Sequence, residues 1–413
     1  MSNIDRYFWC GVADDVCGLF RQVADGAIHQ DVLSSCGARG SVRFATWYDG
    51  SRESLRRTCD AWAAAGAVSP PGKPRIVYIY SGQGSQFEGM GQELWHAWRW
   101  FRADLEGLLS LSRCSADVNL ADIMLGVPGT ENLLRQTQYT QPIMFAFAVA
   151  LTRVWTRWGL KPDAVMGHSL GEFPAAWASG AVSAEDGVRL VTERGRIMQA
   201  LGVEGKYVCV RGELSDVILA VMPYSRTVSV AGANAPSITT VSGPSDDVDR
   251  VAKACVEMGM TVRELPVSLP FHSPMMQPIV REFVNYCEGV VFRPTTTRWI
   301  STLTGRTIGE DTPLTADYWG QQILETVRFW AGMETVGGEQ PSLFLEIGPG
   351  NSLVGMGREA LETPDDHIWL SSLDRRRTDR PSLFDAAVTL WQRGAEIDLE
   401  KAHADCFGSD RPE

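Results

Sequence analysis

Residues 164–178 read AVMGHSLGEFPAAWA and decide the fold of this chain, because they pass from a short apolar strand through a tight turn into a helix. A second apolar run, RIVYIY at 75–80, leads into the glycine-rich loop SGQGSQ. Parallel strands that are buried on both faces carry such unbroken apolar runs. The two units predict a doubly wound α/β sheet with functional loops at the carboxyl ends of its strands.

The turn GHSLG at 167–171 fits the G-x-S-x-G pattern of a nucleophile elbow. The serine of such an elbow occupies a strained turn where flanking side chains would collide, so its hydroxyl projects from the top of the sheet. We therefore predict Ser169 as a nucleophile and the backbone N–H of Leu170 as a donor to a developing oxyanion. The alternative is a purely structural turn, because the pattern also occurs by chance.

A nucleophilic serine needs a base, and the chain contains six histidines. They are His29, His96, His168, His272, His367 and His403. His168 should point away from its neighbour in the elbow. His272, in LPFHSPM, follows a predicted subdomain at the point where the chain re-enters the main domain. Position alone therefore favours His272 as the base, and the alternative is a structural histidine in a proline-bounded loop.

Two further glycine-rich stretches could serve a site. SGQGSQFEGMG at 81–91 lacks the Lys and Ser/Thr of a phosphate-binding loop, so we predict that it supplies the second oxyanion amide instead. EIGPGNS at 346–352 is either another site loop or a plain turn.

The order of predicted elements divides the chain into several parts. One part follows the β-α-β-β-α-β order of a ferredoxin-like subdomain and is inserted into the main sheet domain. A boundary at SPPGKP, residues 69–74, separates a small N-terminal α/β module in which helices are expected around 14–27 and 52–65. The predicted parts are the N-terminal module 1–73, the core 74–204 and 268–369, the subdomain 205–267, and the C-terminal tail 370–413.

Composition excludes several classes of protein. Thirty-eight Lys and Arg against 50 Asp and Glu give a net charge of −12, which argues against nucleic-acid binding. The longest strongly apolar run, 142–151, is too short for a membrane helix, and the first residues lack the pattern of a secretory signal, so we expect a cytoplasmic protein. Nine scattered cysteines form no metal-ligand pattern, so we expect no bound metal and predict buried free thiols.

Six ordered motifs resemble those of one enzyme family. They are GQGSQ at 82–86, TQP at 140–142, GHSLGE at 167–172, ERGRIMQ at 193–199, FHSP at 271–274 and EIGPG at 346–350. The chain resembles the malonyl-CoA:acyl carrier protein transacylases and the acyltransferase domains of polyketide synthases. The resemblance implies an α/β-hydrolase-like core with the inserted ferredoxin-like subdomain, and it likens 1–73 and 368–400 to the linkers that flank these acyltransferases.

The resemblance also implies roles for individual residues. Ser169 matches the acylated serine and His272 its base, while a backbone carbonyl that falls on Gln322 orients the imidazole. The loop residue that supplies the second oxyanion amide corresponds to Gln83, and a residue lining the pocket to Gln141.

Two residues bear on the choice of substrate. Arg194 taken alone predicts a solvated helix charge, but it matches the arginine that pairs with the free carboxylate of malonyl-type substrates. Phe271 matches the aromatic residue that fills the space of an α-methyl group and so favours malonyl. At Leu269-Pro270 the chain differs from malonyl-transferring members of the family, which usually carry His-Ala there. An unusual substrate such as an alkylmalonyl or hydroxymalonyl unit is therefore an alternative.

The resemblance therefore implies transfer of a malonyl-type group from coenzyme A, through an acyl-serine, to the phosphopantetheine thiol of an acyl carrier protein in polyketide biosynthesis. The simplest expectation is a free-standing, trans-acting enzyme with no permanently bound cofactor, and the alternative is an excised piece of a larger synthase. Acyl-CoA and the carrier protein are the expected partners. The alternatives are transfer of a non-carboxylated acyl group, or hydrolysis by an acyl-CoA or acyl-carrier thioesterase.

Overall fold

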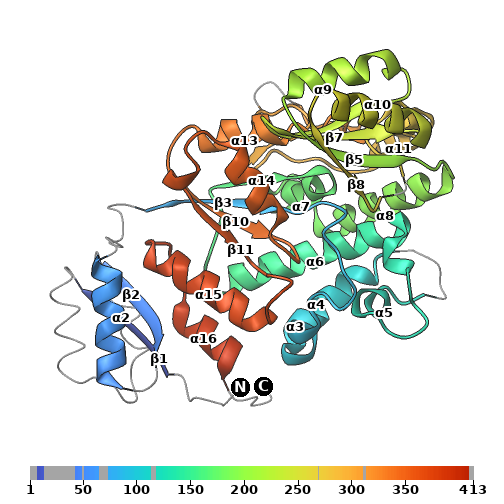
Figure 1. Cartoon of the computed structure of the whole chain (residues 1–413). Coiled ribbons are helices and arrows are strands. Elements are labelled where there is room, and N and C mark those ends of the chain that lie inside the picture. The colour runs from blue at the N-terminus through green and yellow to red at the C-terminus, as the bar shows by residue number, and fades with distance from the viewer. Residues whose placement is uncertain are drawn as a thin grey trace. The chain divides into compact units, whose positions relative to one another are not determined.

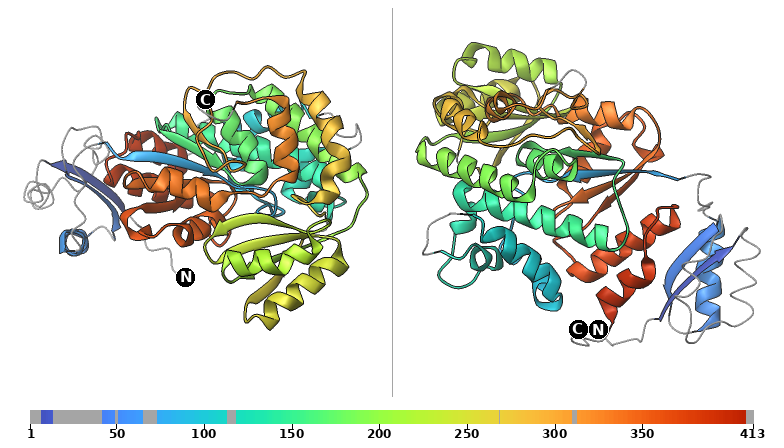
Figure 2. Two further views of the ribbon diagram at one scale, coloured as in Figure 1. Left: turned by 90° about the horizontal axis from the view of Figure 1, so that it is seen from above. Right: turned by 180° about the vertical axis from the view of Figure 1, so that it is seen from behind.

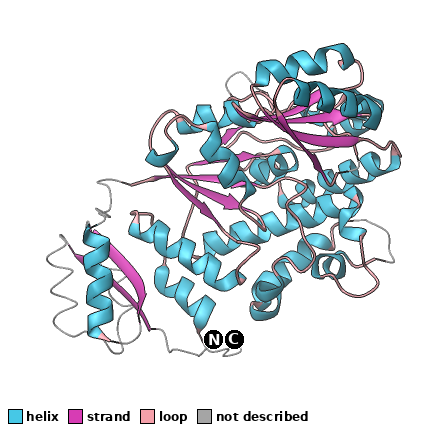
Figure 3. Cartoon of the chain, in the orientation of Figure 1, coloured by secondary structure: helices cyan, strands magenta, loops and turns pink. Residues whose placement is uncertain are grey.

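The computed structural model describes residues 7–13, 42–48, 51–64, 73–112, 118–267, 269–309 and 313–408 (Figure 1). The chain divides into two compact units. The larger unit comprises 76–152 and 162–376, and the smaller unit comprises 1–75, 153–161 and 377–413. Helices and strands alternate through most of the larger unit (Figure 3). No helix among the described residues is long and apolar enough to cross a membrane.

The larger unit contains the predicted α/β sheet. Its strand order is β11-β10-β3-β4-β9, and the pairs β10–β11, β3–β4 and β4–β9 are parallel. Both predicted strand-to-loop units are present, since β3 and β4 are adjacent and end in the SGQGSQ and GHSLG loops. The strands are β3 (Arg75–Tyr80), β4 (Ala164–Gly167), β9 (Arg298–Ile300), β10 (Ser342–Ile347) and β11 (Ile368–Ser371).

Helices cover both faces of this sheet, which explains the unbroken apolar runs of its strands. Val77 and Ile79 pack with Phe329 of α13 and Leu353 of α14 on one face, whereas the hydroxyl of Tyr80 meets Thr152 of α6 on the other. The helices are α3 (Gln92–Ala97), α4 (Arg99–Leu109), α5 (Leu120–Leu125), α6 (Thr137–Arg157), α7 (Glu172–Ala178), α8 (Ala184–Ala200), α11 (Gln277–Cys287), α12 (Ala316–Leu324), α13 (Phe329–Gly337) and α14 (Ser352–Ala360).

The inserted subdomain has the predicted ferredoxin-like order (Figure 2). Its antiparallel sheet has the strand order β6-β7-β5-β8, and α9 and α10 share a valine-rich core with it. The elements are β5 (Lys206–Arg211), α9 (Leu214–Val221), β6 (Ser229–Ala235), β7 (Ile238–Gly243), α10 (Ser245–Glu257) and β8 (Thr261–Leu265). The fold class expected from the sequence is therefore confirmed.

Among its described residues, the smaller unit contains an antiparallel strand pair and the helices α2, α15 and α16. Strand 42–48 and helix 52–64 match the predicted elements, whereas the helix expected at 14–27 lies outside the described residues. The prediction of free thiols is wrong for Cys10, which is disulfide-bonded. The elements are β1 (Tyr7–Ala13), β2 (Val42–Tyr48), α2 (Arg52–Ala64), α15 (Asp379–Gln392) and α16 (Leu399–Phe407).

Short 3-10 turns connect several elements. They are η2 (Leu133–Arg135), η3 (Ser169–Gly171), η4 (Met222–Tyr224), η5 (Pro274–Met276) and η6 (Pro364–Asp366).

The turn GHSLG, called here the nucleophile turn, joins β4 to α7 with no room for side chains at its two glycines. A Cβ atom at Gly167 would overlap the carbonyl oxygen of Gly171, and one at Gly171 would overlap the carbonyl oxygen of Tyr80. Both obstacles are backbone atoms, which cannot rotate away as a side chain can. The two glycines therefore allow the turn to fold tightly against the end of β3.

We expect Gly171→Ala to lower the free energy of unfolding by about 3 kcal/mol, the upper end of the usual cost of overpacking, because overlap with backbone forces the strand and the helix apart. Gly107→Ala in α4 is the matched control, since no atom lies within 4 Å of its Cβ position. This control should gain about 0.4–1 kcal/mol from reduced entropy of the unfolded chain. Chemical denaturation measures both, and equal midpoints for the two variants would contradict the steric argument.

Candidate active site

The structure brings the predicted nucleophile and base together. The Oγ atom of Ser169 lies 2.7 Å from Nε2 of His272, across 103 residues of sequence. Both residues have left-handed backbones, with φ angles of 51° and 54°, and Asn132 is the one other non-glycine residue in the described ranges with a positive φ. Such conformations cost about 1–3 kcal/mol each and persist where the surrounding structure imposes them. Backbone strain of this kind therefore occurs at both residues whose side chains form the Ser169–His272 contact.

A backbone carbonyl orients the imidazole, but it belongs to Glu325 and not to Gln322 as predicted. The Nδ1 atom of His272 lies 3.0 Å from the carbonyl oxygen of Glu325. Since a carbonyl can only accept, Nδ1 carries the proton, and Nε2 is left as an acceptor for the serine hydroxyl. The prediction missed by three residues because α12 ends at Leu324, where Glu325 becomes extended and turns its carbonyl toward the histidine.

The environment keeps His272 neutral. Its side chain is buried, and burial together with the positive charge of Arg194 and the nearby His168 lowers its pKa from 6.5 to about 3. A neutral imidazole with a free Nε2 lone pair can accept the proton of Ser169.

The inserted subdomain holds the backbone that carries the base. The hydroxyl of Ser229, at the start of β6, donates to the carbonyl oxygen of His272, and the hydroxyl of Tyr207, on β5, donates to that of Phe271 at 3.0 Å. His168 points away from the serine as predicted, since its Nε2 lies 2.8 Å from Oδ1 of Asn234 on β6. No sequence motif marks Ser229 or Tyr207, because their role depends on the contact between the subdomain sheet and the loop that carries His272.

The loop that carries Gln83 lies against the nucleophile turn. A Cβ atom at Gly82 would lie 2.5 Å from the carbonyl oxygen of His168, so this loop approaches the turn backbone to backbone. The backbone amides of Gln83 and Leu170 thus belong to two segments that meet beside Ser169.

The EIGPG stretch holds the start of the Gln83 loop through a hydrogen bond to Ser81. The Oε1 atom of Glu346 accepts a hydrogen bond from the hydroxyl of Ser81 at 2.7 Å, and Oε2 accepts one from the N–H of Val354 at 2.9 Å. Glu346 is fully buried, and burial raises its pKa to about 7. The motif left open by the sequence is therefore a support for the site and not a plain turn.

A second buried carboxyl supports the nucleophile turn and was not predicted. Glu172, the first residue of α7, accepts hydrogen bonds from the backbone N–H of Thr302 and from the hydroxyl of Tyr318 at 2.7 Å. The hydroxyl of Thr302 also lies 2.8 Å from the carbonyl oxygen of Gly167. Burial raises the pKa of Glu172 to about 7. The sequence did offer one signal, since Glu172 directly precedes an apolar stretch. Burying a carboxyl without partners is costly, so its position there predicts hydrogen-bond partners from other segments.

Arg194 is buried in the site and is not the solvated helix charge that its sequence context alone suggested. It is 2% exposed, its guanidinium lies 5.6 Å from the ring centre of Phe173, and its Nη2 donates to Oε1 of Gln322 at 3.3 Å. Burial lowers its pKa to about 10, so it stays charged at neutral pH. Its Nε has no hydrogen-bond partner among the described residues.

Gln141 lies along the neighbouring wall. Its Nε2 contacts Oε1 of Gln83 at 3.4 Å and the sulfur of Met198 on α8 at 3.4 Å, while its buried Oε1 has no partner within the described part of the chain. Buried polar atoms without partners are rare in folded proteins. Nε of Arg194 is a second buried polar atom without a partner among the described residues.

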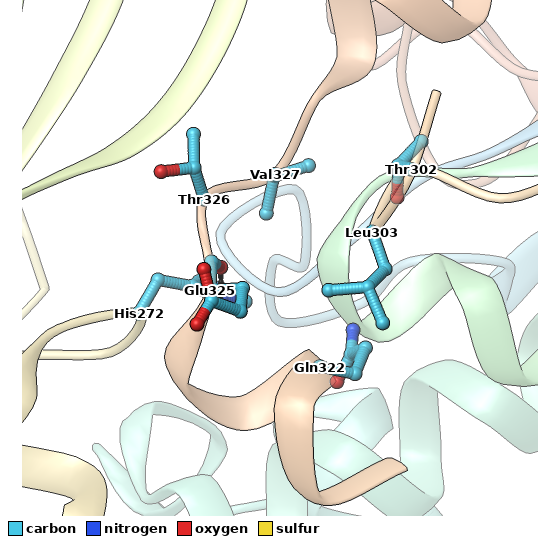
Figure 4. A pocket seen from close by; sticks show the side chains of 7 residues that line it. All are labelled: His272, Thr302, Leu303, Gln322, Glu325, Thr326 and Val327. Carbon is cyan, nitrogen blue, oxygen red and sulfur yellow. Dashed lines mark hydrogen bonds between the residues drawn. The ribbon is translucent and has the colours of Figure 1, made fainter. Parts of the chain in front are cut away.

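Figure 4 shows a small pocket beside the base, with His272 and Gln322 reaching it from separate segments. The lining residues are His272, Thr302, Leu303, Gln322, Glu325, Thr326 and Val327. In the described ranges, no group of three or more His, Cys, Asp and Glu side chains could hold a metal ion.

Comparison with known proteins shows the family of the chain. A family model described as the acyl transferase domain matches residues 77–390. The chain belongs to this acyltransferase family. The match includes Ser169, His272 and Arg194, and the family is one of enzymes.

Relatives of this acyltransferase include much longer synthases. It is 34% identical over 391 residues to polyketide synthase GfsB of Streptomyces halstedii, covering 92% of this chain and 7% of that protein. It is 35% identical over 336 residues to the mycoketide-CoA synthase of Mycobacterium tuberculosis, covering 81% of this chain and 8% of that protein. The chain thus spans less than a tenth of the length of either relative.

Solved structures share its fold. The acyltransferase domain from the second module of the salinomycin polyketide synthase has a TM-score of 0.77 at 29% identity, over 99% of this chain and 87% of that one. The malonyl CoA-acyl carrier protein transacylase from Clostridium perfringens has a TM-score of 0.65 at 27% identity, over 73% of this chain and 94% of that one.

We expect His272 to remain neutral, with its proton on Nδ1, down to about pH 5, because its pKa lies well below the ordinary value of 6.5. Below pH 6.5 the imidazole of His272 binds a proton in the unfolded chain but not in the folded chain. The free energy of unfolding therefore decreases as the pH falls from 6.5 toward 3. Heteronuclear NMR of histidine-labelled protein, assigned with His272→Gln, measures the protonation state. An imidazole that protonates near pH 6.5 would contradict the lowered pKa.

Proposed function

We propose that this acyltransferase moves a malonyl-type, carboxylated acyl group from coenzyme A to the phosphopantetheine thiol of an acyl carrier protein. The observation that carries the proposal is the pairing of Ser169 with a neutral His272 in one buried site with a charged Arg194 whose Nε has no partner among the described residues. A nucleophile with its base supports acyl transfer, and the buried cation supports a substrate that bears an anion.

In the first half-reaction, the Oγ of Ser169 attacks the thioester carbonyl carbon while Nε2 of His272 takes the hydroxyl proton. The backbone amides of Gln83 and Leu170 stabilise the oxyanion. The carbon–sulfur bond then breaks, and the leaving coenzyme A sulfur receives the proton from His272. The product is an ester between the acyl group and Ser169.

In the second half-reaction, the thiol of the carrier protein's phosphopantetheine attacks this ester, and His272 accepts the thiol proton. The ester bond to Ser169 breaks, and the proton returns to the serine oxygen. The carbonyl of Glu325 stabilises the imidazolium that forms in both halves, because it holds the Nδ1 proton. No cofactor other than the two substrates is needed for these steps.

Arg194 selects the acyl group. A guanidinium binds a carboxylate through two parallel N–H donors, and here Nε and the Nη atoms are the donors available. Phe271, buried beside Tyr207, limits the space next to the acyl α-carbon and favours malonyl over branched units. The unusual Leu269-Pro270 segment adjoins it, so longer alkylmalonyl or hydroxymalonyl units belong in any substrate test.

Incubation with malonyl-CoA should add the mass of one malonyl group to the protein, and Ser169→Ala should abolish this adduct because the acylated oxygen is gone. Intact-mass spectrometry measures the adduct, and holo-carrier protein supplied in trans should remove it. A panel of acyl-CoAs identifies the preferred unit. Hydrolysis that outpaces transfer to every carrier tested would favour a thioesterase instead.

Arg194→Ala should lower kcat/KM for malonyl-CoA by about 100-fold, since a charge-assisted bidentate pair contributes about 3 kcal/mol. Acetyl-CoA, which has no free carboxylate, should be affected much less. Arg196→Ala is a matched control, because this neighbouring arginine is half exposed and pairs with Glu193 and Glu282 away from the site. An unchanged preference for malonyl in Arg194→Ala would refute the assigned role.

A further inference from the structure

Gln322 joins the substrate arginine to the nucleophile turn. It lies on α12, is 3% exposed, and its Nε2 donates to the backbone carbonyl of Ser169 at 2.8 Å. Its Oε1 accepts from Nη2 of Arg194 at 3.3 Å. Because a carbonyl only accepts and a guanidinium only donates, both contacts require the same orientation of the amide. The side chain therefore occupies one defined position between the two residues.

The partner that Gln322 offers to Arg194 is neutral. No carboxylate forms an ion pair with Arg194 within 4.0 Å in the described part of the chain, and the buried Glu172 directs its oxygens to Thr302 and Tyr318. A buried cation without an anion is costly, and a carboxylate at this place would remove that cost. The amide satisfies one donor of the guanidinium without adding a negative charge, and Glu172 acts on the charge of Arg194 only from a distance.

We propose that Gln322 is a specificity-determining residue, whose neutral amide keeps the charge of Arg194 available for the carboxylate of the acyl group. The hydrogen bond of 3.3 Å is long, so a substrate carboxylate can compete for the same guanidinium. This inference rests on the proposed function and extends it. It assigns Gln322 to the choice of acyl group, whereas the orientation of His272 belongs to Glu325.

The chemistry predicts opposite results for two variants of nearly the same size. Gln322→Glu places a negative charge beside Arg194, so the enzyme should lose its preference for malonyl-CoA over acetyl-CoA by at least about tenfold. Gln322→Met removes both hydrogen bonds but adds no charge. It should lower both rates, while the ratio of kcat/KM for the two substrates stays within about threefold of the wild type.

The experiment measures kcat/KM for self-acylation by each acyl-CoA in the wild type and both variants. Denaturation midpoints report whether each variant is folded. Loss of preference in Gln322→Glu with retention in Gln322→Met supports the proposal. Retained preference in Gln322→Glu, or equal loss in both variants, overturns it.

Two outcomes need separate treatment. If Gln322→Glu does not fold, Gln322→Met decides alone, because a lost preference there shows that the amide contacts and not their neutrality set specificity.

The wild type separates this inference from the proposed function. If the wild type forms no acyl adduct or shows no preference for malonyl, the proposed function fails; if it does both, only the role of Gln322 is under test.

Discussion

The hydrogen bond between Ser169 and His272 is the interaction on which the rest of the site depends. It joins two residues in left-handed backbone conformations, and each would relax if the structure around it did not prevent this. The restraints on the serine come from the close backbone contacts of Gly167 and Gly171. Those on the histidine come from Glu325 on one side and from the inserted subdomain on the other. Main domain and subdomain thus both contribute to holding this Ser–His pair.

Two buried carboxyls extend these restraints into the main domain. Glu172 ties the nucleophile turn to the segment after β9, and Glu346 ties the Gln83 loop to the start of α14. Each lies behind one of the two segments that carry the proposed oxyanion donors. Their hydrogen bonds offset part of the cost of burying an acid, and the raised pKa of both groups shows that the compensation is incomplete.

Charge is distributed unevenly around the reacting atoms. Arg194 stays protonated, while His272 is kept neutral partly by that same charge. An anionic acyl group bound to Arg194 would reduce the repulsion and make the imidazole a stronger base. In the proposed mechanism, one electrostatic interaction would therefore couple the binding of a carboxylated substrate to activation of the serine, and an uncharged acyl group would not engage it.

The sequence by itself predicted the sheet and the inserted subdomain, because glycine spacing and apolar runs are local properties of the chain, and it named Ser169 and His272 as the pair that the structure brings together. The family resemblance placed the orienting carbonyl on Gln322, whereas the residue that makes this contact lies just after the end of α12. Only the tertiary structure decided that Glu325 holds this role, that Gln322 bridges Arg194 and Ser169, and that Tyr207 and Ser229 brace the base. Those contacts join segments far apart in the chain, so packing and not local pattern selects the partners.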